Sequence, residues 1–501
     1  MTKFFKKYHK WLSLGLTIFI LLFSLSGIVL NHRGLFSGID VKRSILPSDY
    51  EYNNWNRAAV KNTERIGYDS ILIYGNIGIF LTNSSASYFK DFNNGFGKGV
   101  DNHKVERVFL SHDGTLYAGT LFGLYQYDYQ AGAWKLIFRP RHNPRIVDIA
   151  SRGDTLIVMS RSFLFQSTDN EHFNKLQLPA PIGYKNKIGL FKTLWVIHSG
   201  EIYGDMGKLF VDFVALVFIF LSITGLVYFV IPLFLKRKMK RHPLAKTHKL
   251  RMFNRWSLKW HNKIGWITIV FLIVTTFTGM FLRPPLLAVI AYSQVSKIPF
   301  TELDSPNPWF DKLRRIIVDN KNKLAYIATP DGIYVTDSEF NDSLSRFAAQ
   351  PPLSIMGVNT FEQIDDKRFL VGSFEGLFVW DIKTKRVYDA IKQHNYRRDP
   401  NKTIPLGDYL VTGFSEDFDF GKVYFDFNSG AAAIGNPKKF VDMPLPIKNQ
   451  DMSLWNVALE IHTARMYGFM FGKLYILFIP LLGLIVLFIL ISGFIVWWKK
   501  H

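Results

Sequence analysis

The chain contains 501 residues and no cysteine, which excludes disulfides, thiolate nucleophiles and cysteine-ligated zinc or iron–sulfur sites. Its 61 basic and 40 acidic residues give a net charge of +21, which in a soluble chain would indicate nucleic acid or another anionic partner. The length allows two or three domains of ordinary size.

Four apolar stretches are long enough to cross the hydrocarbon core of a bilayer, which is about 30 Å thick. They cover residues 11–30, 209–234, 264–282 and 474–498. The first stretch is expected to remain as a helix, because its 20 residues exceed the apolar region of a cleaved signal peptide. The sequence therefore predicts four transmembrane helices.

Basic residues beside these stretches are distributed unevenly. Segments 1–10, 236–263 and 499–501 hold 17 basic residues and no acidic one. Because short basic flanks stay in the cytoplasm, we expect both termini and the 236–263 loop inside, and residues 31–205 and 284–460 outside. The charge thus follows membrane topology, and nucleic acid is not an expected partner. We expect a multi-pass membrane protein with two large external loops.

The two halves of the chain repeat their membrane segments. His9 and His261 open the first and third spans, and each is followed by a glycine 18 residues later. His198 and His462 precede the second and fourth spans, and each is followed by a Tyr-Gly pair that begins five residues later. Equivalent spans run in the same direction, so the halves form a parallel repeat about an axis along the membrane normal. Such an axis brings equivalent residues face to face.

The external segments repeat with a different period. The pattern is a small residue, two variable positions, Gly, an aliphatic residue, an aromatic residue and, three residues later, Asp or Asn. Its copies run from Gly75 to Asn83, Thr120 to Asp128, Thr329 to Asp337 and Ser373 to Asp381, with weaker copies near Ser160 to Asp169 and Gly421 to Asp426. Successive glycines are 45 and 44 residues apart within the halves, a spacing typical of propeller blades. Two separate antiparallel sandwiches remain an alternative interpretation.

These patterns predict a membrane α plus β protein. Its four transmembrane helices form a parallel two-fold repeat, and its β-rich, propeller-like periplasmic domain has about six blades, three from each external segment. The expected boundaries are 1–35 for the first helix with a cytoplasmic N-terminus, 36–190 for the first half of the β domain, 191–236 for the second helix, 237–262 for the basic cytoplasmic loop, 263–290 for the third helix, 291–450 for the second half of the β domain and 451–501 for the fourth helix with a cytoplasmic C-terminus.

The repeated histidines are the main candidates for chemistry. A neutral imidazole is a good axial ligand for iron, and two of them on facing helices suit a haem inside a four-helix bundle. His9 with His261 would form a site near the cytoplasmic face, and His198 with His462 a site near the external face. Two haems at opposite faces would form an electron path across the membrane. The alternative is four interfacial histidines bonded to backbone or lipid headgroups.

Other polar residues near the spans are weaker candidates. Several cations can contact haem propionates or reach lipid headgroups, namely Lys10, Lys263, Lys208, Lys473, Arg465 and Arg283. Asp212 is an intramembrane carboxylate that can relay a proton from a quinol or bond to a neighbouring helix. His32 is a reserve ligand only, because its counterpart in the repeat, Pro284, cannot ligate a metal.

At these motifs the chain resembles the PepSY-associated transmembrane family. The family signatures are a His-aromatic start with Ser-Gly near the far end, and a His-x4-Tyr/Phe-Gly lead-in to the next helix. They correspond to Tyr8-His9-Lys10-Trp11 with Ser26-Gly27, His198 with Tyr203-Gly204, and His462 with Tyr467-Gly468, in about 130 residues of the chain. Family members commonly carry small α/β PepSY domains outside the membrane, where this chain shows the blade pattern.

The resemblance implies an inner-membrane ferric-siderophore reductase with two b-type haems, ligated by His9, His261, His198 and His462. Electrons would pass from the cytoplasmic haem to the external haem and reduce a ferric siderophore or another ferric chelate. No flavin or nicotinamide motif is visible, so the donor is expected to be a quinol or a separate reductase. A periplasmic lipoprotein or receptor is a further candidate partner, and membrane lipid surrounds the helices.

Two other classes of function remain open. One is a non-catalytic sensor or scaffold, whose β domain binds a periplasmic ligand or partner while the helices anchor it. The other is a permease, which is disfavoured because the four spans carry few polar residues.

Overall fold

The computed structural model describes residues 2–141, 143–241, 247–291, 293–397, 407–436 and 439–499. The chain divides into two compact units. The first, here called the helical unit, consists of Met1–Phe36, Asn186–Ser305 and Leu454–His501. The second, the sheet unit, consists of Ser37–Lys185 and Pro306–Ser453.

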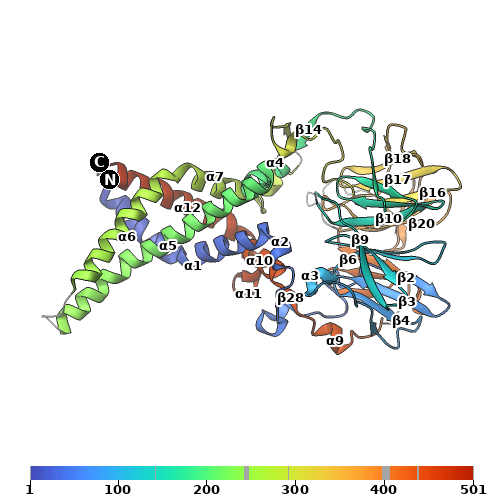
Figure 1. Ribbon diagram of the computed structural model, residues 1–501, viewed down its shortest axis with the longest axis horizontal. Coiled ribbons are helices and arrows are strands. Elements are labelled where there is room, and N and C mark those ends of the chain that lie inside the picture. The colour runs from blue at the N-terminus through green and yellow to red at the C-terminus, as the bar shows by residue number, and fades with distance from the viewer. Residues whose placement is uncertain are drawn as a thin grey trace. The chain divides into compact units, whose positions relative to one another are not determined.

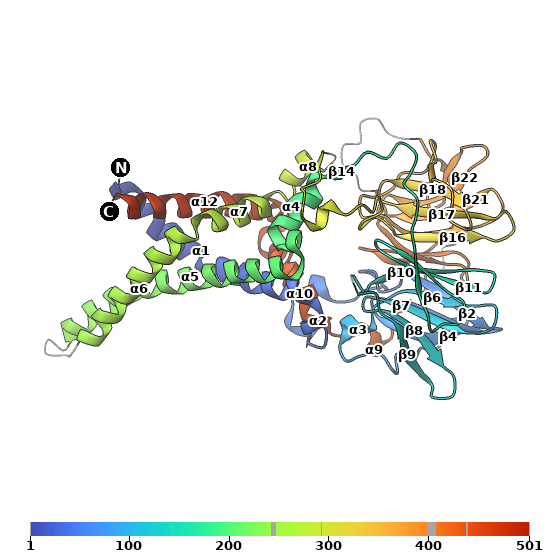
Figure 2. The ribbon, with the colours of Figure 1, turned by 45° about the horizontal axis from the view of Figure 1, so that its top comes forward.

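The helical unit is built from long apolar helices and short helices that lead into them. Their bounds are α1 (Thr2–Asn31), α2 (Arg33–Phe36), α4 (Leu190–Ser199), α5 (Gly204–Arg241), α6 (His248–Ile267), α7 (Ile269–Met280), α8 (Leu286–Ile290), α10 (Leu454–His462), α11 (Gly468–Phe471) and α12 (Tyr475–Trp498). α1 packs against α5, α10 and α12, while α7 packs against α4 and α12. The start of α1 lies beside the second half of α12 (Figures 1 and 2). The ring centroids of Phe5 and Phe488 are 6.2 Å apart.

Three segments of the described chain are long and apolar enough to span a membrane. They are Lys3–Asn31, Glu201–Arg241 and Arg465–Trp498. The predicted third span is a pair of helices, α6 and α7, which meet at Thr268 with a bend of 67°. The membrane-spanning character is therefore confirmed, with three spans, or four if the bent pair crosses as one.

The histidine lead-ins to the second and fourth spans form short helices of their own. α4 ends at Gly200, whose φ is +81°, and a Cβ there would lie 2.1 Å from the carbonyl oxygen of Gly207. Only glycine allows this left-handed conformation and close approach. The chain also turns after α10, at Ala464 with φ +59°. His198 and His462 consequently lie on helices separate from α5 and α12.

The described part of the sheet unit contains six antiparallel sheets of three to five strands, each formed from consecutive strands of the chain (Figure 2). The first three are β2 (Asn62–Gly67), β3 (Ser70–Gly75), β4 (Gly78–Thr82) and β5 (Lys90–Asp91); β6 (Val105–Leu110), β7 (Leu116–Thr120), β8 (Leu124–Asp128) and β9 (Ala133–Phe138); and β10 (Ile146–Arg152), β11 (Thr155–Ser160), β12 (Leu164–Ser167) and β13 (Asn174–Leu176).

The second half of the chain supplies the other three sheets. They are β16 (Arg315–Asp319), β17 (Leu324–Thr329), β18 (Gly332–Asp337) and β19 (Ser345–Arg346); β20 (Val358–Gln363), β21 (Arg368–Ser373), β22 (Gly376–Asp381), β23 (Val387–Asp389) and β24 (His394–Asn395); and β25 (Val411–Ser415), β26 (Val423–Asp426) and β27 (Gly430–Ala433). Two small pairs join β1 (Asp40–Val41) to β28 (Met452–Ser453), and β14 (Lys187–Gly189) to β15 (Gln294–Ser296).

The first strands of the six sheets contact one another in a cycle. The order is β2, β6, β10, β16, β20, β25 and back to β2. A cluster of buried apolar side chains lies between each sheet and the next, including one between the sixth and the first. Since a single small sheet cannot bury both of its faces, these clusters supply the core of the unit. The expected β-rich domain is thus confirmed.

The glycine of the sequence repeat marks a tight turn before the third strand of a sheet. Gly78, Gly332 and Gly376 begin β4, β18 and β22, and Gly123 precedes β8. All four have φ between +92° and +151°, which is strained for residues with a Cβ. The prediction for the sixth sheet was wrong in detail. The segment at Gly421 leads into β26, the second strand, and the matching turn glycine is Gly430, at the start of β27.

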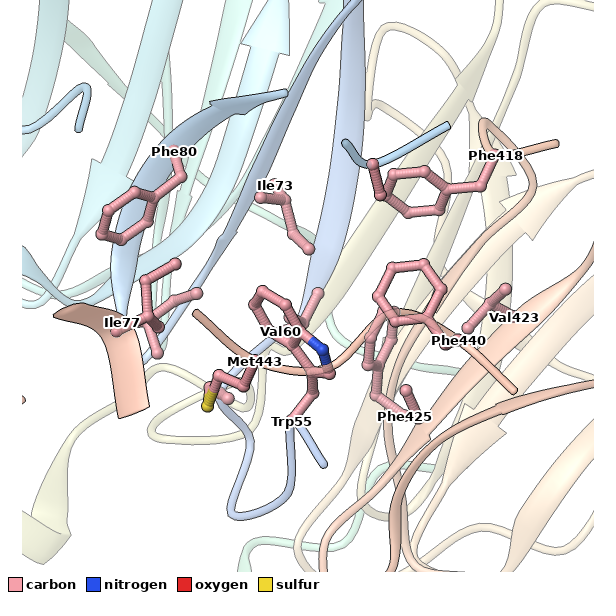
Figure 3. Packing of buried hydrophobic residues seen from close by; sticks show 14 of the residues in the cluster. Trp55, Val60, Ile73, Ile77, Phe80, Phe418, Val423, Phe425, Phe440 and Met443 are labelled. Atoms are coloured by element: carbon pink, nitrogen blue, oxygen red, sulfur yellow. The ribbon is translucent and has the colours of Figure 1, made fainter. Parts of the chain in front are cut away.

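An aromatic cluster joins the first sheet to the sixth, although the two are far apart in the sequence (Figure 3). Phe440 is 1% exposed, and its ring lies 5.0 Å from Phe418, 5.9 Å from Phe425 and 5.9 Å from Trp55. The indole Nε1 of Trp55 donates a hydrogen bond of 2.8 Å to the carbonyl of Val441. The cluster therefore stabilises the contact between the sixth sheet and the first, which completes the cycle.

We expect Phe440→Leu to lower the free energy of unfolding of the sheet unit by about 1–2 kcal/mol, because leucine keeps apolar volume but loses the ring contacts. Urea unfolding of the full chain in detergent, followed by near-UV circular dichroism, measures the change. Tyr68→Leu is the matched control, since Tyr68 is fully exposed. Equal unfolding midpoints for the two variants would contradict the prediction.

Candidate functional site

The four repeated histidines meet as two pairs within the helical unit. The ring centroids of His9 and His261 are 6.3 Å apart, with an angle of 84° between the ring planes. Those of His198 and His462 are 5.9 Å apart, with an angle of 53°. These are the two pairs that the sequence repeat predicts.

Each histidine is anchored through its Nδ1 atom to a helix other than its own. His9 Nδ1 lies 2.9 Å from the carbonyl oxygen of Ile489 on α12, and His198 Nδ1 lies 2.9 Å from that of Thr275 on α7. His462 Nδ1 lies 3.0 Å from the carbonyl oxygen of Phe23 on α1. A carbonyl oxygen can only accept, so Nδ1 carries the proton and the lone pair is on Nε2.

His261 follows the same scheme through a hydroxyl. Its Nδ1 lies 3.0 Å from Thr224 Oγ1 on α5. That hydroxyl donates its own hydrogen to the carbonyl oxygen of Phe220, at 2.7 Å, so it accepts from the imidazole. All four histidines therefore have Nε2 available as a ligand atom.

Each of the four imidazole rings lies against a serine or threonine that is followed by a glycine. The hydroxyls lie between 3.0 and 3.5 Å from the Nδ1 atoms. A Cβ on the following glycine would lie between 2.7 and 3.4 Å from the histidine Cε1. The four dipeptides, with the histidine that each contacts, are Ser26-Gly27 with His462, Thr224-Gly225 with His261, Thr278-Gly279 with His198, and Ser492-Gly493 with His9. We call them the hydroxyl-glycine seats.

Sequence reasoning found two of these seats and missed two. Ser26-Gly27 and Thr278-Gly279 stand at equal distances from His9 and His261, which made them visible. Thr224-Gly225 is 26 residues after His198, and Ser492-Gly493 is 30 residues after His462. The spacing differs because α11 and an additional 3-10 turn lie between α10 and α12. The shared dipeptide itself was the available signal.

The histidine pairs fit a haem held by two axial imidazoles. A metal bound on both sides by imidazole nitrogens at about 2 Å would place the ring centres about 6 Å apart. The two observed distances of 6.3 and 5.9 Å agree with this spacing. A cavity of about 470 Å³ is lined by His9, His261 and two seat glycines, Gly225 and Gly493. A ligating histidine normally bonds its other nitrogen to the protein, as all four do here.

The two pairs are separated along α1. His9 and Ser26, which contacts His462, are 17 residues apart on this uninterrupted helix. At 1.5 Å per residue this is about 25 Å. The bilayer core is about 30 Å thick, so the pairs lie near opposite ends of the spans.

The predicted cations occupy varied surroundings. Lys10 lines the cavity, and its Nζ lies 4.8 Å from the centre of the Phe229 ring. Lys263 Nζ lies 5.2 Å from the Trp260 ring. Two further candidates form ion pairs: Lys208 Nζ lies 3.6 Å from Asp205 Oδ1, and Arg465 Nη2 lies 2.5 Å from Glu460 Oε1. Lys473 is exposed and Arg283 is half-buried. Of these residues only Lys10 lines the described cavity.

His32 and Asp212 contact each other, not the histidine pairs. His32 Nε2 lies 2.5 Å from Asp212 Oδ2, and Asn31 Nδ2 donates to Asp212 Oδ1 at 2.9 Å. This contact engages the Nε2 atom by which His32 would bind a metal. Asp212 bonds to a neighbouring helix, which was one of its two expected roles. Within the described ranges, no three or more His, Asp or Glu side chains form a group suited to a metal ion.

Comparison with solved structures gives distant similarities. One is the extracellular domain of a putative hybrid two-component system from Bacteroides thetaiotaomicron, with 12% identity and a TM-score of 0.36, covering 74% of this chain and 32% of that chain. Another, described as a putative one-component system of the same organism, has 12% identity, a TM-score of 0.33 and coverages of 77% and 40%. This chain thus matches less than half the length of either. No curated protein sequence matches it.

Comparison with protein families gives a match over nearly the whole chain. The family described as the PepSY-associated TM region matches residues 7–500. The match includes all four histidines and all four seats. The chain therefore belongs to the PepSY-associated TM family.

Proposed function

We propose that this protein is a di-haem reductase of a bacterial inner membrane, which passes electrons to a ferric siderophore or another ferric chelate in the periplasm. The observation that carries the proposal is the anchoring of four histidines in two facing pairs, each with Nδ1 bonded and Nε2 available. An interfacial histidine that bonds only to headgroups has no need of a partner imidazole or a glycine seat.

His9 with His261, and His198 with His462, would each hold one b-type haem. A bound haem supplies reversible one-electron chemistry at its iron. The protein's own residues fix the imidazole rings, exclude bulk water and set the distance between the sites along α1. Lys10, at the cavity wall, is placed to meet a propionate. The electron donor is a quinol or a separate reductase, since the chain has no recognisable flavin or nicotinamide motif.

The proposed topology has four spans, and the third is formed by the last residues of α6 together with α7. The basic segments 1–10, 236–263 and 499–501 then lie in the cytoplasm. His9 and His261 would lie near the cytoplasmic face, and His198 and His462 near the periplasmic face. Electrons would therefore travel outward, and the reducing end would meet a periplasmic substrate.

We interpret the sheet unit as a six-bladed propeller in the periplasm. The cyclic contacts of the first strands and the six apolar clusters between successive sheets support this architecture. Its role in the proposal is to bind the ferric chelate or a partner lipoprotein or receptor. Reduction releases the metal, because ferrous iron is a softer cation and is held less tightly by hard oxygen ligands.

Optical spectra of the purified full chain test the proposal. We expect a Soret band and reduced α bands that correspond to two haems per chain after dithionite reduction. His198→Ala and His261→Ala should each remove about one haem, because each leaves one axial ligand without its partner. His172→Ala is the matched control, since His172 lies on an exposed turn of the sheet unit.

A second measurement tests the reaction. Wild-type protein in vesicles, reduced from the proposed cytoplasmic side, should release ferrous iron from a ferric hydroxamate on the other side, where a ferrous-specific chelator detects it. The two histidine variants should lose this activity. Absence of a Soret band in the wild type, or unchanged spectra in both variants, would refute the ligand assignment and favour the anchored sensor or scaffold.

A further inference from the structure

A cavity of about 340 Å³ lies among the first strands of the sheet unit. Five of the six first strands contribute to its wall. Representative residues are Asn62 on β2, Arg107 on β6, Asp148 on β10, Arg315 on β16 and Glu362 on β20. A cavity of this size suits a small organic molecule. It belongs to the sheet unit and contains none of the four repeated histidines.

Arg107 brings a positive charge to the cavity, and one of its hydrogen-bond donors is unused. Its Nε atom is buried and has no hydrogen-bond partner among the described residues. The nearest carboxylate oxygen, Asp148 Oδ1, is 3.7 Å away. Asp148 already accepts from the backbone amides of Ile149 and Ile316, at 3.0 and 2.8 Å. Arg107 Nε can therefore donate a hydrogen bond to a ligand.

The second arginine of the cavity behaves differently. Arg315 donates from Nε to the carbonyl of Asn359 at 2.9 Å and from Nη1 to that of Val147 at 2.5 Å. It joins neighbouring strands and is a structural element.

Tyr74 supplies a second unused group. Its side chain is fully buried, and its hydroxyl, which lines the same cavity, has no hydrogen-bond partner among the described residues. The backbone of Val108 lies near the hydroxyl, but not in hydrogen-bonding geometry. Burial raises the pKa of Tyr74 to about 12, so the phenol keeps its proton and is a donor at neutral pH. Buried hydroxyls without a partner are uncommon in folded proteins.

The acidic side chains around the cavity are already engaged. Glu362 Oε1 accepts from Asn62 Nδ2 at 2.8 Å, and Glu64 Oε1 accepts from the amide of Leu110 at 3.1 Å. Burial raises the pKa of both carboxyl groups above the ordinary range of glutamate. The Arg107 guanidinium and the Tyr74 phenol, which both donate hydrogen bonds, are thus among the groups open to a ligand.

We propose that this cavity binds a small organic carboxylate, whose oxygens accept hydrogen bonds from the Arg107 guanidinium and the Tyr74 hydroxyl. A carboxylate matches the planar fork of an arginine and satisfies two donors at once. The site is separate from the haem reaction, and a ligand there would act on the sheet unit itself.

Calorimetric titration of succinate into the purified full chain in detergent tests this site. We expect saturable binding of succinate and none of succinamide, which has the same shape without the charges. Arg107→Met should weaken binding by at least about tenfold, because it removes a charge-assisted bond. Tyr74→Phe should likewise weaken it by at least about tenfold, the effect of one hydrogen bond to a charged acceptor. Arg368→Met is the matched control, since Arg368 is exposed on β21 and pairs with Asp365.

Near-UV circular dichroism shows whether the variants keep the fold. Tyr74→Phe removes a single oxygen and decides the question if Arg107→Met unfolds. The proposal is overturned if wild-type protein binds neither succinate, citrate nor glutamate, if inorganic phosphate binds and the carboxylates do not, or if binding is unchanged in both cavity variants. Because the cavity and the histidine pairs belong to different units, a protein without haem should bind succinate equally well.

Discussion

Replacing Gly279 with valine is expected to remove the haem proposed for the His198–His462 pair, although no ligand is changed. A Cβ at Gly279 would lie 2.7 Å from His198 Cε1 and 3.1 Å from its Nδ1. The imidazole cannot keep its place at these distances, because Nδ1 is bonded to the carbonyl of Thr275 on the same helix, α7. The ring must leave its seat, which moves Nε2 from its position in the pair.

The haem content of purified Gly279→Val should fall from two per chain to one, as measured by the pyridine haemochrome. Gly493→Val should produce the complementary loss, since a Cβ there would lie 2.8 Å from His9 Cε1. Gly15→Val is the matched control on α1, because a Cβ at Gly15 meets no atom within 4 Å. Two haems in Gly279→Val, with unchanged axial ligation by electron paramagnetic resonance, would show that the seats do not position the ligands.

Repetition is the reason that much of this architecture could be predicted. A turn that needs φ above +90° requires glycine each time, so Gly78, Gly123, Gly332 and Gly376 reveal the period of the sheets. The pairing of His9 with His261, and of His198 with His462, follows from a similar argument, because a two-fold axis brings equivalent residues together. In both cases one position needs one residue type, glycine or histidine, and the repeat places that residue at a fixed spacing in the sequence.

Features that depend on contacts between distant segments produce no residue type at a fixed spacing, so they could not be predicted from the sequence. The break at Gly200 depends on the approach of the Gly207 carbonyl, and the bend between α6 and α7 falls within a continuous apolar stretch. The cavity lined by Tyr74 and Arg107 needs six strands from both halves of the chain, none of which identifies it alone. Glycine spacing likewise misplaced the sixth turn, because Gly421 and Gly430 both adopt positive φ in the same sheet.

A buried ion-pair cluster in the sheet unit leads to the largest expected change in stability. Glu106 on β6 is 6% exposed, and its carboxylate oxygens lie 2.6 Å from Lys61 Nζ and 2.7 Å from Arg145 Nη2. Burial alone would raise the pKa of Glu106, but Arg145 and Lys61 outweigh burial and hold that pKa well below its usual range. Burial lowers the pKa of Lys61 to about 8 despite its pairing with Glu106.

Glu106→Gln should therefore lower the free energy of unfolding at pH 7 by about 3 kcal/mol, because it leaves the largely buried Lys61 and the partly buried Arg145 without their counter-ion. The depressed pKa of Glu106 means that its ionised form stabilises the fold above the ordinary pKa of 4.5, and that this stabilisation is lost as the pH falls further. Glu106 raises the pKa of Lys61 in the wild type, so Lys61 loses its proton at a lower pH in the variant and one unpaired charge disappears there. The difference between wild type and variant should thus be largest between the ordinary pKa of Glu106 and the pH at which Lys61 of the variant loses its proton.

Urea unfolding of the full chain in detergent at pH 3.5, 7 and 9.5 measures this difference, with hydrogen exchange of the β2 and β6 amides as a local readout. Glu339→Gln is the control, since Glu339 is largely exposed and its 3.0 Å pair with Arg152 is open to solvent. An exposed pair of this kind contributes about 0–1 kcal/mol. The prediction is contradicted if Glu106→Gln lowers the free energy of unfolding no more than Glu339→Gln does. It is also contradicted if the loss caused by Glu106→Gln is as large at pH 3.5 as at pH 7.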